Sequence, residues 1–372
     1  MTVYLYLMLW GSFWAFLSIC FPKRDKLTHI AIKPNMLLAI IAILGLTIFA
    51  GLRSSGFDTD AYISFYNKTV PPNIFYIFNG ASEWSRDTGF LVLATIIKMF
   101  ISTDFHYFLF IIALITSVAL FSVLYNWSFN YLFSIFLFFS SGLFSWYFNG
   151  MRQFLAAILI FTLIPLILRR KTFLFIVLVI IISTFHGSAL ILIPVYFIVQ
   201  MKPWSRNVML VFSGFIIGAF FLNRLLPAFF TLLENTQYGG YYKDVSESGA
   251  MGIFRLIIAA VTPVLAFIGR RVTEEKNDKL INICVNMSLL SLGFYILSLS
   301  GGRIFFGRMT VYFELYNLIL LPWLLKNIFS SKSRIIIYSL CIGCYVFNFY
   351  YQMTVAWNSY YTSDVLGLFW VR

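Results

Sequence analysis

The sequence predicts an all-α polytopic membrane protein, and three observations predict this class: the composition, the recurring apolar runs and the clustering of basic residues. Of the 372 residues, 60% are hydrophobic and only 11% are charged. A soluble domain of this size needs a more polar surface, so the lipid bilayer is the solvent that this chain requires. The apolar runs recur from Val3 to Tyr351 between short charged or Gly/Pro-containing breaks. We therefore expect one integral membrane domain over residues 1–372.

The first apolar run, Val3 to Phe21, is predicted to be a retained transmembrane helix. Lys23, Arg24 and Lys26 follow this run, and no basic segment precedes it. A secretory signal peptide has the opposite order, with its basic segment first.

Five basic clusters assign the sides of the membrane. They lie at 23–33, 169–171, 202–206, 270–279 and 326–334. The positive-inside rule places all five in the cytoplasm, so the chain crosses an even number of times between consecutive clusters. The helices expected between the clusters are 35–52, 105–125, 131–149, 152–168, 172–184, 187–200, 207–222, 253–269, 280–300 and 309–325. With the first and last apolar runs this gives about 12 transmembrane helices, within a range of about 11 to 13, and both termini outside.

Two segments, 53–104 and 223–252, are expected to form the larger extracytoplasmic loops. Residues 89–101 in the first loop are too few to span the bilayer and include Lys98, so we expect a short amphipathic helix at the membrane interface. The net charge of +13 must be divided by membrane side before it can indicate a partner. Under this topology it predicts no nucleic-acid partner.

The spacing of the cysteines, histidines and acids predicts neither a metal site nor a cofactor. The four cysteines lie in apolar segments without a neighbouring histidine, at Cys20, Cys284, Cys341 and Cys344. Disulfides and zinc are therefore not expected. Asp58 and Asp60 form a D-x-D pattern, which occurs in metal sites for sugar nucleotides. Because this loop is outside and nucleotide sugars are cytoplasmic, we interpret Asp58, Thr59 or Asp60 as the cap of a helix that carries Tyr62.

Arginine is enriched on the predicted outer face. That face holds eight arginines against three lysines: Arg53, Arg86, Arg152, Arg224, Arg255, Arg303, Arg308 and Arg372, against Lys68, Lys98 and Lys243. Membrane orientation disfavours outer cations, so the set needs another cause. Bidentate binding of phosphate is the role that a guanidinium group suits best, although snorkelling or pairing with outer acids explains any single arginine equally well.

Three of these arginines stand at positions that favour an anion. Arg152 follows Asn149-Gly150-Met151 at the start of a membrane helix, where free backbone N–H groups and the helix dipole attract negative charge. Arg303 and Arg308 lie in a short glycine-bounded connection. Two cations placed close together at the headgroup level suit a pyrophosphate group.

Other outer residues are candidates for acid–base chemistry and for sugar binding. His186 lies at the turn of an outer hairpin, where an imidazole suits a general base or a phosphate donor, or simply caps the turn. Asp58 is a candidate for activating a sugar hydroxyl. Tyr62, and Tyr241 in the Gly- and Tyr-rich loop, are candidates for stacking on sugars, although interfacial tyrosines also anchor membrane proteins.

Five short motifs resemble the Wzy/EpsG-type polymerases of bacterial surface polysaccharides. They are Arg53 to Asp60 with Tyr62, Asp87-Thr88-Gly89-Phe90, Met151-Arg152-Gln153, Phe185-His186-Gly187-Ser188-Ala189-Leu190, and Arg303 to Phe313. The motifs together span residues 50–315. The chain departs from the relatives at Asp87, where many of them have the glutamate of a Glu-x-Gly-Phe motif.

The resemblance implies a membrane glycosyltransferase of the GT-C type in the bacterial inner membrane. Such an enzyme joins undecaprenyl-pyrophosphate-linked oligosaccharide repeats on the periplasmic face, and transfers the growing glycan to the non-reducing end of the next lipid-linked repeat. The resemblance implies that the enzyme needs no cofactor. It also implies a chain-length regulator and a flippase as further partners. We assign His186, Arg152 and Asp58 to catalysis. We assign the binding of pyrophosphate and glycan to Arg53, Arg303, Arg308, Gln153, Arg255, Tyr62 and Tyr241.

Three other functions remain open on the sequence. An O-antigen ligase uses the same donor with a different acceptor. A lipid-linked oligosaccharide flippase is the non-enzymatic alternative, but it needs basic residues along a central cavity, whereas the arginines here lie at outer helix ends. A membrane acyltransferase that uses His186 would leave the arginines without a role.

Overall fold

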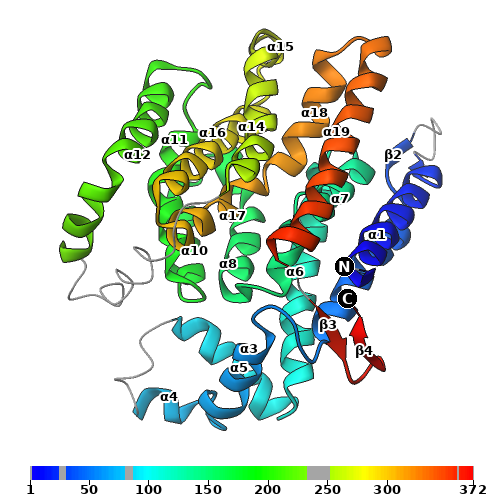
Figure 1. The fold of residues 1–372 in the computed structure, drawn as a ribbon, viewed down its shortest axis with the longest axis vertical. Coiled ribbons are helices and arrows are strands. Elements are labelled where there is room, and N and C mark those ends of the chain that lie inside the picture. The colour runs from blue at the N-terminus through cyan, green and yellow to red at the C-terminus, as the bar shows by residue number, and fades with distance from the viewer. Residues whose placement is uncertain (1, 25–30, 80–86, 233–251, 358–359, 372) are drawn as a thin grey trace. The chain divides into compact units, whose positions relative to one another are not determined.

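The computed structural model describes residues 2–24, 31–79, 87–232, 252–357 and 360–371 (Figure 1). Two compact units divide the chain. Unit 1 comprises Met1–Thr162, Ile180–Gly187 and Ser331–Arg372, and unit 2 comprises Leu163–Val179 and Ser188–Ser330.

Unit 1 is built on six apolar helices. They are α1 (Thr2–Cys20), α2 (Met36–Gly51), α6 (Phe105–Trp127), α7 (Tyr131–Ser140), α8 (Met151–Phe161) and α19 (Ser331–Tyr351). Helix α2 packs between α1 and α6, and α6 packs against α8. Asn35, Asp104 and Asn130 cap the N-termini of α2, α6 and α7 with their side chains, which satisfies N–H groups that the helix itself leaves unpaired.

Small and hydroxylated residues hold α2 against α6. The Thr47 hydroxyl hydrogen-bonds to the Ser117 hydroxyl at 2.6 Å, and Ser117 contacts the Tyr147 hydroxyl at 3.0 Å. A Cβ atom on Gly51 would lie 2.6 Å from the Cα atom of Phe110, so only glycine permits this approach. Close packing of small residues and hydrogen bonds between helices are the interactions that hold helices together within a bilayer.

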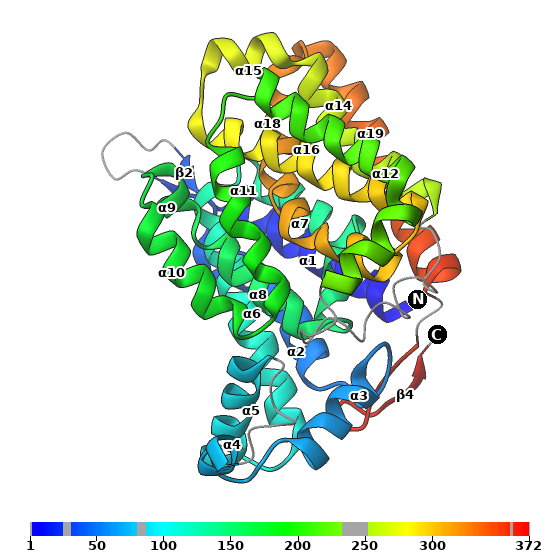
Figure 2. The ribbon, with the colours of Figure 1, turned by 90° about the vertical axis from the view of Figure 1, so that its left-hand side faces the viewer.

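Short helices between α2 and α6 form a layer at the N-terminal end of α6 (Figures 1 and 2). They are α3 (Thr59–Ser64), the π-helical turn η1 (Phe65–Thr69), α4 (Phe75–Asn79) and α5 (Thr88–Phe100). Tyr66 stacks on Phe108 of α6 with a ring-centroid distance of 4.6 Å. Helix α5 buries Phe90, Leu91 and Ile97 in the same apolar cluster. The expected short helix at 89–101 is thus present, with its apolar face packed on protein.

Two small antiparallel hairpins complete unit 1. Strands β1 (Lys23–Arg24) and β2 (Ala31–Lys33) pair with each other, as do β3 (Tyr361–Ser363) and β4 (Leu368–Val371). The second hairpin attaches to the start of the 53–104 segment, because the Ser54 N–H donates to the Thr362 carbonyl at 2.9 Å and the Tyr361 hydroxyl donates to the Phe49 carbonyl at 2.9 Å. Neither hairpin is expected from the sequence, which predicts an all-α protein.

Unit 2 is organised around the helix α16. Its elements are α9 (Ile164–Leu168), the first part of α10 (Thr172–Ser183), η3 (Gly187–Ile191), α11 (Leu192–Val199), α12 (Arg206–Leu232), α14 (Ile253–Ile268), α15 (Arg270–Lys276), α16 (Lys279–Ser300), the π-helical turn η4 (Arg303–Gly307), α17 (Val311–Glu314) and α18 (Asn317–Ile328). Helix α16 contacts α11, α12, α14, α17, α18 and η4. Its Asn286 side chain donates to the carbonyls of Val199 and Met201, which anchors α11 to it.

The structure confirms a nearly all-helical protein with apolar helices that suit a membrane. Four helical segments in the described residues are long and apolar enough to cross a bilayer: Thr2–Cys20, Phe105–Trp127, Lys279–Ser300 and Ser331–Ala356. The bent pair α14 and α15, at 62°, would be a fifth. Large side chains such as Phe173 and Phe220 are 83% and 84% exposed, as lipid-facing residues are. The count of about 12 spans remains a prediction.

Several expected helices differ in their bounds. The expected helix 309–325 is divided into α17 and α18, and 187–200 begins with the 3-10 turn η3. The expected helix 152–168 breaks between α8 and α9, because Pro165 in the first turn of α9 has no N–H to continue α8. The expected helix 131–149 stops at Ser140, and Gly142 at φ 92° starts the 3-10 turn η2 (Leu143–Tyr147). Helix α12 extends to Leu232, so the first residues of the expected loop 223–252 are helical.

Candidate functional site

Arg152, at the start of α8 in unit 1, forms an ion pair with Asp87. Its guanidinium nitrogen lies 2.8 Å from the Asp87 Oδ2 atom, and the Arg152 side chain remains 41% exposed, against 12% for Asp87. The carboxylate is therefore shielded from water while part of the guanidinium still faces it. A charge-assisted hydrogen bond of this length orients the arginine.

The same Asp87 oxygen contacts His186. The His186 Nδ1 atom lies 3.3 Å from Asp87 Oδ2, and the imidazole is 28% exposed. Because a carboxylate can only accept hydrogen bonds, this contact requires the proton of the neutral imidazole to sit on Nδ1. The Nε2 atom is then the unprotonated nitrogen, which is the form that a general base needs.

A glycine allows Asp87 and His186 to approach each other. The Gly89 N–H donates to the Thr184 carbonyl at 2.8 Å. A Cβ atom on Gly89 would lie 2.1 Å from the Thr184 hydroxyl oxygen and 2.8 Å from its Cβ atom. Asp87 itself adopts a left-handed conformation at φ 55°, which is uncommon for a residue other than glycine. The start of α5 is thus pressed against the chain that leads to His186.

The Tyr62 hydroxyl completes the surroundings of Arg152. Both the backbone N–H and the guanidinium of Arg152 hydrogen-bond to this hydroxyl. Burial raises the pKa of Tyr62, an effect that the positive charge of Arg152 partly offsets. The hydroxyl is therefore neutral at neutral pH and keeps a proton to donate.

Asp58 approaches the same helix N-terminus from another side. Its Oδ2 atom accepts from the Gly150 N–H at 3.1 Å, and its own N–H donates to the Phe148 carbonyl at 3.3 Å. The side chain makes no capping bond to α3, the helix that it precedes. Of the three residues expected to cap α3, Asp58 occupies the N-cap position, but its carboxylate accepts from Gly150, the residue before α8, and not from the backbone of α3.

These contacts change the expected role of the α8 N-terminus. From the sequence, the N–H groups at this end of α8 are expected to attract a bound anion. In the structure the Asp58 carboxylate accepts from Gly150 and the Tyr62 hydroxyl accepts from Arg152. A phosphate ligand would therefore meet the exposed guanidinium of Arg152 and not these backbone groups.

Arg53 is fully buried beneath the site. Its Nε atom donates to the Thr59 hydroxyl at 2.8 Å, and its terminal nitrogens contact the Ala50 carbonyl and the Met151 sulfur. Its guanidinium also lies 5.4 Å from the centre of the Phe148 ring. Burial lowers the pKa of Arg53 to about 10, so the group stays charged at neutral pH. These bonds hold the 53–59 loop against α8 from within.

The remaining candidates from the sequence lie in unit 1, in unit 2 or outside the described residues. Gln153 in unit 1 is buried, at 3% exposure. In unit 2, Arg255 is partly exposed and Arg308 is exposed. Arg303 begins the turn η4, which contacts α16, but its side chain lies outside the described part. Tyr241 also lies outside the described residues.

Two acids that lie beside sequence candidates, one in each unit, were not candidates themselves. Asp87 connects Arg152 with His186, and the only signal for it was the short motif before α5. In unit 2, Glu314 hydrogen-bonds to Tyr295 and lies near Arg255. Glu314 could have been chosen from the sequence because it is a single carboxylate in an apolar run, and ionisable residues in such runs are usually functional.

The unit 1 site combines an oriented imidazole, a half-exposed guanidinium and a neutral phenol. Such a set can remove a proton from a hydroxyl group and stabilise negative charge that develops nearby. In the described parts of the chain, no group of three His, Cys, Asp or Glu side chains could hold a metal ion.

Comparison with known proteins gives one match. Residues 36–363 match the model of the EpsG family, a range that includes every described residue of the unit 1 site. No curated protein and no solved structure matches the chain. This family has a general role in polysaccharide polymerisation, consistent with a membrane enzyme of polysaccharide biosynthesis. The match covers most of the chain, and the protein is therefore a member of the EpsG family.

Proposed function

We propose that this protein polymerises oligosaccharide repeats linked to undecaprenyl pyrophosphate, on the outer face of the bacterial inner membrane. The growing glycan leaves its lipid pyrophosphate and joins the non-reducing end of the next lipid-linked repeat. The observation that carries the proposal is the Arg152–Asp87–His186 cluster, which pairs a base with a phosphate-binding group. The residues of this cluster belong to motifs that resemble those of the polymerase family.

His186 acts as the base in this proposal. Asp87 accepts the Nδ1 proton, so Nε2 takes the proton of the acceptor hydroxyl as its oxygen bonds to the anomeric carbon of the donor. The positive charge that forms on the imidazole is stabilised by the Asp87 carboxylate. A base in this position contributes roughly 100-fold to 10,000-fold to the rate.

Arg152 stabilises the leaving group. The bond between the anomeric carbon and the pyrophosphate oxygen breaks, and negative charge accumulates on the pyrophosphate. The 41% exposed guanidinium offers N–H groups to that charge while Asp87 and Tyr62 hold it in place. Donors aimed at developing charge lower the barrier because they need no reorganisation.

The other candidates have supporting roles. Asp58 and Arg53 position the start of α8 and the loop before it, by the contacts with Gly150 and Thr59. We assign Arg303, Arg308 and Arg255 to the pyrophosphate, and Gln153, Tyr62 and Tyr241 to the glycan. A chain-length regulator and a flippase are proposed partners, and the GT-C class is part of the proposal.

The test is to delete the gene in its native strain and to complement it with wild type, Arg152→Ala or Asp60→Asn. Asp60 is an exposed acid in the same loop and serves as the matched control. A polymerase predicts that deletion reduces a polymer ladder to a single capped repeat, which wild type and Asp60→Asn restore and Arg152→Ala does not.

Two other outcomes of the deletion would contradict the proposal, the first seen on the gel and the second by labelling intact cells and inverted membrane vesicles. Lipid-linked polymer that is not attached to its final acceptor identifies an O-antigen ligase. Single repeats that accumulate only on the cytoplasmic leaflet identify a flippase.

A further inference from the structure

A second set of polar side chains lies in unit 1, outside the site described above. His106 is the second residue of α6, and Asp104 caps that helix. The Asp104 Oδ1 atom lies 2.9 Å from the backbone N–H nitrogen of His106 and 2.9 Å from its Nδ1 atom. As the carboxylate only accepts, Nδ1 carries the proton and Nε2 is left as an acceptor.

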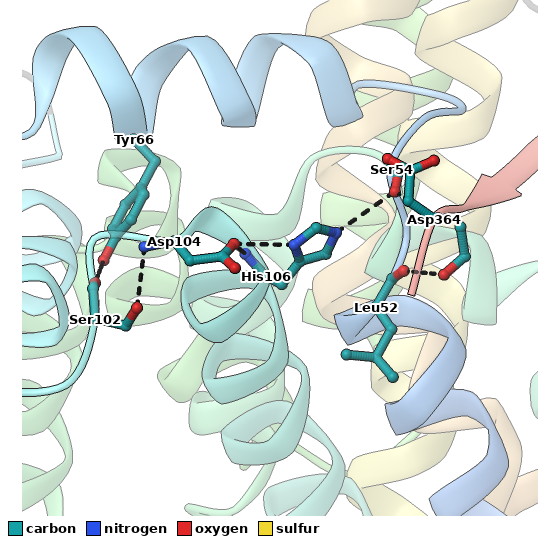
Figure 3. Close-up of polar contacts among 8 residues, drawn as sticks. Leu52, Ser54, Tyr66, Ser102, Asp104, His106 and Asp364 are labelled. Carbon is teal, nitrogen blue, oxygen red and sulfur yellow. Dashed lines mark hydrogen bonds and ion pairs between the residues drawn. The ribbon is translucent and has the colours of Figure 1, made fainter. Parts of the chain in front are cut away.

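The Ser54 hydroxyl lies on the Nε2 side of this imidazole (Figure 3). The Ser54 Oγ atom is 3.4 Å from His106 Nε2. The same Oγ atom accepts from the Asp364 N–H at 3.0 Å, so its own hydrogen is available to donate to Nε2. Such contacts are commonly longer without substrate than in the reacting complex.

The surrounding structure fixes both partners. The Ser54 N–H donates to the Thr362 carbonyl at 2.9 Å, so the β3–β4 hairpin holds the serine. The Phe105 ring lies 4.0 Å from the His106 ring and restricts its rotation. The His106 side chain is 14% exposed and Ser54 is partly exposed, so both residues lie near the protein surface.

Helix capping does not account for this arrangement. A cap needs only the bond from the His106 backbone N–H to Asp104. The Nδ1 contact and the serine on the far side of the ring are additional. Several helix hydroxyls in unit 1 donate to carbonyls three or four residues earlier, as at Ser18, Thr95 and Thr116, whereas Ser54 faces an imidazole.

We propose that Ser54, His106 and Asp104 form a second catalytic site, which cleaves carboxylic esters. Ser54 is the nucleophile, His106 the base and Asp104 the group that orients and stabilises the imidazole, the roles of a Ser-His-Asp triad. None of the three belongs to the Arg152–Asp87–His186 cluster. The activity is therefore separate from glycan transfer.

The reaction proceeds in two balanced steps. Nε2 takes the hydroxyl proton as Ser54 Oγ bonds to the ester carbonyl carbon, the bond to the alkoxy oxygen breaks, and the alcohol leaves with that proton. Water then attacks the acyl-serine by the same route, which releases a carboxylic acid and restores Ser54. The natural ester we infer is an O-acyl group on a sugar hydroxyl, and this choice alone rests on the proposed function.

The test uses the full-length protein in nanodiscs, with a fluorophosphonate probe and with p-nitrophenyl acetate. Neither probe requires the lipid-linked repeat, so failure here is distinguishable from failure of the polymerase proposal. We expect covalent labelling of Ser54, located by peptide mass spectrometry, and hydrolysis of the acetate. Ser54→Ala should abolish both, whereas Ser55→Ala should retain them, because the Ser55 hydroxyl bonds to Thr362.

Asp104→Asn separates the triad from the helix cap. Asparagine caps a helix as well as aspartate does, but it removes the carboxylate that stabilises the imidazolium. We expect a fall of roughly 100-fold or more in the labelling rate with an unchanged melting temperature. Equal labelling rates in wild type and folded Asp104→Asn would overturn the proposal. Wild-type protein in which Ser54 takes no label would overturn it without any variant.

Discussion

Replacing Asp87 by asparagine tests the link between the base and the phosphate-binding group. The variant keeps the size of the side chain but removes the negative charge that Arg152 contacts at 2.8 Å and His186 at 3.3 Å. The asparagine amide can also donate to Nδ1, which would place the imidazole proton on Nε2 and block its function as a base.

The expected effect on activity is much larger than the effect on stability. Loss of the oriented base costs roughly 100-fold to 10,000-fold in rate. An ion pair whose arginine is 41% exposed is screened by water and contributes about 1 kcal/mol or less to folding. We therefore expect a near-normal melting temperature with almost no polymer.

The assay compares initial rates of polymer formation by purified Asp87→Asn, wild type and the control Asp60→Asn. The double variant Asp87→Asn with His186→Ala should be slowed by much less than the product of the two single effects, because residues that act as a unit have non-additive effects. A rate for Asp87→Asn within about threefold of wild type would refute the reasoning, since a missing base costs at least about 100-fold.

Three further predictions concern Arg152, Gly89 and Tyr66 in unit 1. Arg152→Lys keeps the charge but loses the forked donors, so polymer formation should fall by about 100-fold with the fold intact; near-wild-type polymer would contradict its role. Gly89→Ala should displace Thr184 and with it His186, and lower the rate by at least about 10-fold, whereas Gly343→Ala, which meets no atom within 4 Å, should not. Burial raises the pKa of Tyr66 from 10.0 to about 12, so the unfolded chain loses this proton first and stability falls between these values. The stability advantage of wild type over Tyr66→Phe, measured by denaturant titration, should therefore shrink from pH 10 to pH 12, and a constant difference would contradict this assignment.

The helical membrane class and most helix positions were predictable, because hydrophobicity and the positions of basic residues act locally. The same reasoning failed where a local backbone feature decides the outcome. Gly142 ends the helix expected at 131–149, and Pro165 interrupts the one expected at 152–168. The β3–β4 hairpin has no apolar periodicity of its own, and it forms against residues 49–55 from the other end of the chain.

Several residues of the proposed site could be chosen from the sequence, but the contacts between them could not. Arg152, His186, Asp58 and Tyr62 were identified from residue type and position. Asp87 was missed as the group that joins two of them, because its contact with His186 depends on a close approach at Gly89 that only three-dimensional structure reveals. Arg53 was expected to face a ligand, whereas its fully buried side chain supports the loop instead.

The most direct test of the central claim uses purified protein in proteoliposomes with a single substrate, the lipid-linked repeat. Wild type should produce a ladder of longer glycans and release one undecaprenyl pyrophosphate for each bond formed, and His186→Ala should reduce both by roughly 100-fold or more. If wild type forms no ladder and releases no lipid pyrophosphate, or if His186→Ala works as fast as wild type, the account of the Arg152–Asp87–His186 site is contradicted.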